Sequence, residues 1–231
     1  MAYTRAQVAT LIRQRCDIEN TTAQVASEIN NHIQDAANYV HDFLIGVYGP
    51  SYAVGTDSFA TIAGQAAYTP SNTIGDLYIP LSVRLEFDDE SIPLDAFSDL
   101  DRVTRASGQS WGPGYLPQYR FQRSIDNDYD VVFDPPPDAV HTVTLRYHTT
   151  PPEYTLDNDP VNLPHVDLLI AEACIRVKTK EERDASLFLG ERAAIQKRIE
   201  DWVGKVDNGN VMQTLVIPRR RLSGSRRGRL F

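Results

Sequence analysis

The sequence predicts an α+β fold: a helical bundle built from N- and C-terminal helices, a β-rich insertion of sandwich or barrel type, and an extended C-terminal tail. Three patterns predict it. Apolar residues recur with a helical period near the N-terminus, the middle of the chain alternates apolar and polar residues with prolines in its turns, and helical periods then return. The expected division is residues 1–50 for the N-terminal helices, 51–160 for the β-rich insertion, 161–210 for a C-terminal helix pair, and 211–231 for the tail.

The longest helical pattern covers residues 22–47. Its apolar positions form one stripe along a helix; they are Val25, Ile29, Ile33, Ala36, Val40, Leu44 and Val47. Its other faces carry amides and acids, namely Glu28, Asn30, Asn31, Gln34, Asp35, Asn38 and Asp42. The best matching apolar stripe lies between residues 182 and 206, so we expect the two ends of the chain to pack together. The polar face is expected to meet water or a neighbouring subunit.

The shorter helices are predicted from caps and periodicity. Thr4 and Gln7 form a capping box for a first helix that runs to about residue 15, and Thr21 with Gln24 offers a second box before the long helix. A largely buried helix is expected from about residue 164 to 180. After a short break, the last helix is expected to turn five residues inward: Phe188, Ile195, Ile199, Trp202 and Val206.

The β-rich part is predicted from alternation. Residues 81–87 alternate and then turn toward Ile92 and Leu94, which predicts a hairpin. A second hairpin is expected from residues 129–133 and 143–147, joined by the turn at 134–138. Residues 105–117 are rich in Gly, Ser and Pro, so we expect a long loop that is functional or ordered by a partner.

Composition bounds the class of protein. The chain has 231 residues, 42% of them hydrophobic, and no apolar run approaches the roughly 20 residues of a membrane span. The N-terminus lacks the apolar core of a signal peptide. We therefore expect a protein that is made in a cytosol and has no membrane as a partner. Cys16 and Cys174 lie on different predicted helices and far apart in the sequence, which favours buried free thiols over a disulfide or a zinc site.

The charge is unevenly distributed. The formal net charge is −8, but the last fourteen residues hold six arginines and no acid. The body before them carries 17 basic and 31 acidic residues, which gives −14 for the body and +6 for the tail. Such a tail is expected to bind an acidic protein surface or nucleic acid, or only to add solubility.

Nucleotide-binding and zinc-protease signatures are absent from the sequence. It contains no GxxxxGK[ST] or GxGxxG loop and no HExxH helix. GQSWG at residues 108–112 has the GxSxG spacing, but it lies within the expected long loop at 105–117. Asp126, Asp128 and Asp130 have the first spacings of a calcium loop, but Val131 stands where glycine is needed and Pro137 where glutamate is needed. We therefore expect a polar hairpin turn there, and no catalytic residue, metal or cofactor.

Histidines and aromatic residues are candidates for contacts with other proteins. His32 and His41 fall on opposite sides of the long helix, where surface or interface positions are expected. Six aromatic residues gather beside Gly and Pro in expected loops, where they either anchor an interface or cover the ends of the core. These residues are Tyr48, Tyr52, Trp111, Tyr115, Tyr119 and Tyr154, and Trp111 is expected to be exposed.

Five stretches, taken in order, resemble a known family. They are TRAQVATLIRQRCDI, TTAQVASEINNHIQDAANYV, AGQAAYTPS, VVFDPPPDAVHTVTLRYHTTPPEYTLDND and VNLPHVDLLIAEAC. Together they resemble the head-to-tail adaptor (connector) proteins of tailed bacteriophages. The resemblance implies a structural role without catalysis: a ring, commonly of twelve copies, that lies under the portal, extends the DNA channel and offers a platform for the tail. Residues 105–117 and the strongly basic end are not explained by the resemblance.

The resemblance also implies partners. They are the portal protein, further copies of the chain, tail or neck proteins below, and double-stranded DNA that passes without specific binding. The protein would lie at the capsid–tail junction of the virion and assemble in the host cytoplasm. The segment that would reach the portal is 211–231, with Arg219, Arg220, Arg221, Arg226, Arg227, Arg229 and Phe231.

Three alternatives remain open from the sequence. The chain could be another neck or tail component, such as a tail-completion or nozzle protein. It could be a nucleic-acid-binding module that depends on the arginine tail. It could be a virion enzyme acting on carbohydrate, for which Asp126 and Asp128 would be the carboxylates to test.

Overall fold

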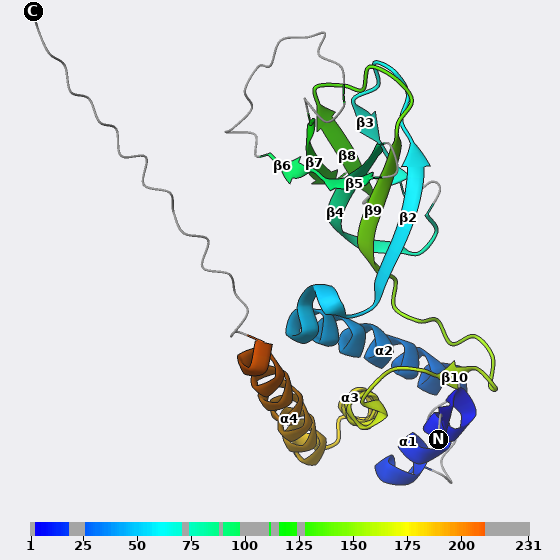
Figure 1. Ribbon diagram of the computed structural model, residues 1–231. Coiled ribbons are helices and arrows are strands. Elements are labelled where there is room, and N and C mark those ends of the chain that lie inside the picture. The colour runs from blue at the N-terminus through cyan, green and yellow to red at the C-terminus, as the bar shows by residue number, and fades with distance from the viewer. Residues whose placement is uncertain are drawn as a thin grey trace, which may run out of the picture.

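A computed structural model describes residues 3–18, 26–70, 74–87, 90–97, 111, 116–123 and 128–210, with residues 205–210 described by their backbone. The helices are α1 (Arg5–Cys16), α2 (Ala26–Tyr48), the short 3-10 helix η1 (Gly49–Ser51), α3 (Val166–Lys180) and α4 (Ser186–Asn210). The strands are β1 (Tyr3–Thr4), β2 (Val54–Ala60), β3 (Ala67–Tyr68), β4 (Leu77–Phe87), β5 (Glu90–Pro93), β6 (Asp95–Ala96), β7 (Gln118–Arg123), β8 (Tyr129–Asp134), β9 (Thr142–Thr149) and β10 (Pro160–Val161). Helices gather at one end of the molecule and the two larger sheets at the other, so the predicted α+β class is confirmed (Figure 1).

The predicted helices near the N-terminus form as expected. Thr4 Oγ1 accepts a hydrogen bond from the Gln7 amide at 3.3 Å, and Gln7 Oε1 accepts one from the Thr4 amide at 3.0 Å. This capping box satisfies two backbone N–H groups that the first turn of α1 leaves unpaired. The second predicted box, Thr21 with Gln24, lies outside the described residues.

The α2 stripe is buried as predicted. The stripe residues from Ile29 to Leu44 are at most 1% exposed, while Val47 is half-buried and Val25 lies outside the described residues. The partner of this stripe differs from the prediction, however. Helix α3 lies in the middle of the bundle and packs against α1, α2 and α4, whereas the sequence pointed to residues 182–206 (Figure 1). α3 can fill this place because it is apolar on several faces, with Leu168, Ala173 and Val177 fully buried.

The two ends of the chain do come together. Strand β1 pairs with β10 in antiparallel register, with Tyr3 opposite Val161. Side chains from α1, α2, α3 and α4 share one hydrophobic core. Cys16 and Cys174 are buried free thiols in this core, as predicted, although the Cys16 sulfur lies only 3.9 Å from the Cys174 carbonyl oxygen.

The last helix is rotated relative to its prediction. Phe188, Ile195 and Ile199 are buried, but the buried row continues to Val203, and Trp202 is 56% exposed. The expectation that Trp202 faces inward is therefore wrong. Val206 lies in the part of α4 whose side chains are not described.

Two four-stranded sheets form the β-rich part, with strand orders β2-β9-β4-β5 and β3-β8-β7-β6. Inward residues from both sheets share a second core that includes Val83, Leu85, Val131, Phe133 and Leu145. The predicted hairpin of β4 and β5 is confirmed by their antiparallel register.

The second predicted hairpin is wrong. β8 pairs with β7 and β3, whereas β9 pairs with β2 and β4. The turn at residues 134–138 therefore carries the chain from one sheet to the other. A proline-rich turn between two alternating segments fits either geometry, because alternation identifies a strand but not its neighbour.

Two histidines connect the helices to the sheets. Nε2 of His41 on α2 lies 2.9 Å from the carbonyl oxygen of Thr149, and Nδ1 of His148 on β9 lies 2.7 Å from that of Tyr52. A carbonyl only accepts, so both nitrogens carry protons. His41 is 2% exposed, which corrects the expectation of a surface position, and its burial lowers its pKa.

Candidate protein interaction site

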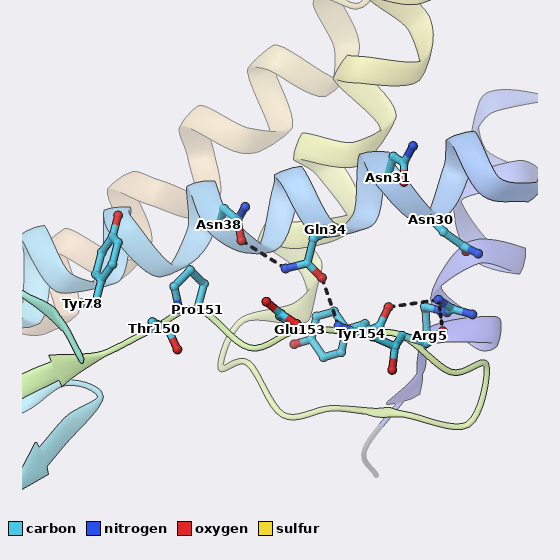
Figure 2. Close-up of a pocket in the computed structure, with 11 residues that line it drawn as sticks. Arg5, Asn30, Asn31, Gln34, Asn38, Tyr78, Thr150, Pro151, Glu153 and Tyr154 are labelled. Atoms are coloured by element: carbon cyan, nitrogen blue, oxygen red, sulfur yellow. Dashed lines mark hydrogen bonds between the residues drawn. The ribbon is translucent and has the colours of Figure 1, made fainter. Parts of the chain in front are cut away.

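A polar groove runs beside α2 where the chain returns from the sheets to the helices (Figure 2). It has a volume of about 490 Å³. We call it the amide groove, and it is lined by Arg5, Asn30, Asn31, Gln34, Asn38, Tyr78, Thr150, Pro151, Glu153, Tyr154 and Thr155. One wall of the groove is the polar face of α2. The sequence predicts that this face meets water or a neighbouring subunit.

Gln34 fixes the two walls of the groove relative to each other. Its Nε2 donates to the Pro152 carbonyl oxygen at 3.0 Å and to Asn38 Oδ1 at 3.1 Å. Its Oε1 accepts the Tyr154 backbone N–H at 3.0 Å (Figure 2). A single side chain thus pairs with the backbone of residues 152–154 much as a neighbouring strand would.

Arg5 closes one end of the groove from α1. Its guanidinium donates to the carbonyl oxygens of Tyr154 at 3.0 Å and Thr155 at 2.8 Å, and to Asp157 Oδ1 at 2.7 Å. The Arg5 side chain is 10% exposed. Sequence reasoning did not single out this residue, since an arginine at the first position of a helix carries no signal of burial.

The groove is suited to a protein segment rather than to nucleic acid. Asn31 and Asn38 are exposed, and amide side chains both donate and accept hydrogen bonds, so they can pair with a peptide backbone. Arg5 is the one cation among the residues that line the groove, and its three contacts are within the chain. Glu153 adds a carboxylate that would repel phosphates.

A second hollow lies at the opposite end of α2. We call it the aromatic pocket; it has a volume of about 360 Å³ and is lined by Tyr48, His165, Arg198, Ile199 and Trp202. The Tyr48 ring meets the Trp202 ring edge-on at a centroid distance of 6.2 Å, and Tyr52 stacks on Tyr48 at 6.0 Å.

The polar groups of this pocket already have partners. The Tyr48 hydroxyl and His165 Nε2 lie 3.2 Å apart, and Arg198 Nη2 pairs with Asp167 Oδ2 at 2.6 Å. Ile199 is buried, while Trp202 remains largely exposed. The surface that the pocket offers is therefore mainly apolar.

The residues predicted to anchor an interface fall into three groups. Tyr48 and Tyr52 are half-buried at the aromatic pocket and next to it. Trp111, Tyr119 and Tyr154 are 4%, 5% and 7% exposed; the first two belong to the core of the sheets and Tyr154 to the core of the helices. Tyr115 lies outside the described residues, as do the seven tail residues Arg219, Arg220, Arg221, Arg226, Arg227, Arg229 and Phe231.

The expectation that Trp111 is exposed is wrong. Its ring stacks on His141 at 5.2 Å and meets Phe133 edge-on at 5.1 Å. A tryptophan in a Gly- and Pro-rich stretch has no periodic pattern to signal its burial. Its role as an interface residue stays a prediction, and would require the core to open.

In the ranges that the structure describes, no group of three or more His, Cys, Asp or Glu side chains could hold a metal ion. In the same ranges, no helix is long and apolar enough to cross a membrane.

Comparison with known proteins supplies the family. No curated protein matches the chain. The family model described as SU10 adaptor protein matches residues 3–214, which include both hollows and all of the described helices and strands. Proteins of this family are phage structural adaptors, which implies association with portal and tail proteins in the virion. Because the match covers most of the chain, the protein belongs to the SU10 adaptor protein family.

Proposed function

We propose that this protein is a head-to-tail adaptor, whose copies form a ring under the portal, connect the capsid to the tail and extend the DNA channel. The observation that carries the proposal is the family match over residues 3–214. The amide groove supports it, because its α2 wall presents exposed amide side chains, such as Asn31, that can pair with a neighbouring copy. The role requires no catalysis and no cofactor.

Ring formation requires that one surface of the chain meet a different surface on the next copy. The amide groove, on one side of the bundle, is the surface that we propose for one half of this contact. Contacts of this heterologous kind close into a ring when the rotation between copies divides a full turn. The resemblance implies about twelve copies, and the interface would lie along the polar face of α2.

The basic tail is the segment that we propose to bind the portal. Its six arginines carry a charge opposite to that of the body, and arginine forms paired hydrogen bonds with carboxylates. An acidic groove on the portal would suit it. Tail or neck proteins would then bind the opposite side of the ring.

The acidic body suits a channel for DNA. A negatively charged lumen repels the phosphate backbone, so the duplex slides without binding. This part of the proposal fails if the carboxylates of the assembled ring face outward. Assembly would take place in the host cytoplasm, before the tail is attached.

Co-sedimentation with portal rings of the same virus tests the proposal. The full chain and a truncated chain that ends at Pro218 are each mixed with portal rings. We expect several copies of the full chain to sediment with each ring, and the truncated chain to remain in the supernatant. Absence of binding by both chains, with retention of the full chain on DNA at moderate salt, would overturn the adaptor role in favour of a nucleic-acid-binding module.

A further inference from the structure

The aromatic pocket is incomplete in the described part of the chain. Trp202 is 56% exposed, although it is a large aromatic residue beside a buried core. Tyr48 and Ile199 line the same hollow, and the Tyr48 ring contacts the Trp202 ring. An indole in this position gains most when further apolar atoms cover its face.

The chemistry of the pocket selects an uncharged, apolar occupant. Arg198, the cation of the lining, pairs with Asp167 at 2.6 Å, and His165 has the Tyr48 hydroxyl as its partner. A charged occupant would gain no free counter-ion from these groups and would lose its hydration. An aliphatic side chain would gain contacts with the Trp202 and Tyr48 rings at no such cost.

The chain itself carries a suitable segment within reach. Helix α4 ends at Asn210, eight residues after Trp202, which corresponds to about 12 Å along the helix axis. An extended chain that reverses after Asn210 covers this distance in about four residues at roughly 3.3 Å each. A chain that reversed in this way would bring Leu215, Val216 and Ile217 beside Trp202.

We propose that the aromatic pocket is the binding site for the apolar segment 211–217 of the same chain, with the side chains of residues 215–217 against Trp202. Five of the seven residues in this segment are apolar, namely Val211, Met212, Leu215, Val216 and Ile217. The first arginine of the tail follows two residues after Ile217. Docking would therefore fix the point from which the arginines leave the body, beside the C-terminal end of α2.

The docking is independent of the proposed function and is tested on the isolated protein. The consequence for portal binding rests on the proposed function, because it requires the portal to be the partner of the arginines. A failure of portal binding would leave the docking result intact. A failure of docking would leave the co-sedimentation result intact.

Fluorescence quenching of Trp202 measures the docking. The chain has two tryptophans, so the substitution Trp111→Phe isolates the emission of Trp202. In this background we compare the full chain with a chain that ends at Asn210, using acrylamide as the quencher. We expect truncation to raise the quenching constant about twofold and to shift the emission to longer wavelength, because an aromatic face returns to water.

Two matched variants separate the apolar segment from the arginines. A chain that ends at Pro218 lacks all six arginines and is expected to keep the protection of the full chain. The triple substitution Leu215→Ser, Val216→Ser and Ile217→Ser keeps the arginines and is expected to lose the protection. If Trp111→Phe impairs folding, the same comparisons are made with Trp111 retained, since its buried ring adds a constant background.

Two results would overturn the proposal. Equal quenching of the full chain and the chain ending at Asn210 would show that the segment does not cover Trp202. Protection that disappears on dilution would assign the pocket to the segment of a second copy instead. We expect protection that is the same at all protein concentrations.

Discussion

Arg5 shows how much of this fold depends on one buried charge. The residue begins α1, yet its guanidinium pairs with two carbonyl oxygens and one carboxylate on the segment at residues 154–157. This segment forms one wall of the amide groove. Removing the guanidinium leaves the carbonyl oxygen of the buried Tyr154 without this donor, and unpaired buried groups are costly, whereas Thr155 and Asp157 are exposed to water.

We expect Arg5→Ala to lower the free energy of unfolding by about 1–3 kcal/mol, measured by urea denaturation. Arg15→Ala is the matched control on the same helix. The Arg15 side chain is 41% exposed and pairs with Glu191 at 2.9 Å, so its removal should cost less than about 1 kcal/mol. Equal effects of the two substitutions would contradict the role assigned to Arg5.

His41 is expected to make stability depend on pH. Burial lowers its pKa from the ordinary 6.5, so the folded protein favours the neutral ring more than the unfolded chain does. The contribution to stability is therefore complete above pH 6.5 and is lost as the pH falls through the lowered folded pKa. His32, whose pKa burial also lowers, acts in the same direction.

The substitution His41→Gln tests this dependence. Glutamine can still donate to the Thr149 carbonyl oxygen but does not titrate. We expect the variant to lose less stability than the wild type between pH 7 and pH 5, measured by urea denaturation at each pH. A loss of the same size in both proteins would show that His41 does not carry the effect.

The sequence was least informative about the burial of individual side chains. The capping box was predictable because Thr4 and Gln7 lie only three residues apart, so the pattern is local in the sequence. Burial of Trp111 and exposure of Trp202 were not, because both depend on contacts that are distant in the sequence. In α4 the buried row passes through Val203 rather than Trp202, a rotation that spacing alone does not resolve.

At the scale of elements, the pairing of β2 with β9 depends on a glycine. Gly55 lies opposite Tyr147, and a Cβ atom at Gly55 would lie 2.7 Å from the Tyr147 ring. The ring cannot easily move, because it is 4% exposed and its hydroxyl donates to Asp76 Oδ1 at 2.9 Å. The glycine is thus required by the close approach of an aromatic ring.

We expect Gly55→Ala to destabilise the protein by about 1–3 kcal/mol, because it overpacks this contact. Gly75→Ala is the control, since a Cβ atom there would have no neighbour within 4 Å. Thermal unfolding followed by circular dichroism compares the two variants. A lower melting temperature for Gly75→Ala than for Gly55→Ala would contradict the account.

Elements were predictable where a pattern is local. The α2 stripe and the hairpin of β4 and β5 follow from periodicity and from a short turn. The central place of α3 and the separation of β8 and β9 into different sheets did not follow. Periodicity gives the face that an element buries, but the partner is chosen by the competition among all apolar faces of the chain.

The amide groove gives a prediction about assembly. We expect Asn31→Arg, on the exposed polar face of α2, to leave the unfolding free energy within about 0.5 kcal/mol of the wild type. The same substitution should abolish ring formation on the portal, because it places a bulky charge where the next copy would lie. Ala193→Arg, on an exposed position of α4, is the control and should assemble normally. Normal assembly of Asn31→Arg would exclude this face from the interface.

At the scale of the whole molecule, the described residues form two hydrophobic cores. Side chains in the helical layer form one core and those in the sheets form another. The chain connects these parts through β2 and through the segment after β9, which also lines the amide groove. The predicted division at residues 51–160 stays a prediction, as does the assignment of portal and tail contacts to the two ends.

Electron cryo-microscopy of the protein bound to portal rings tests the central claim most directly. The account predicts a closed ring of copies on one face of the portal, with the amide groove of each copy filled by its neighbour and the channel continuous through both rings. Isolated copies on the portal, or a ring in which the amide groove faces open solvent, would contradict it.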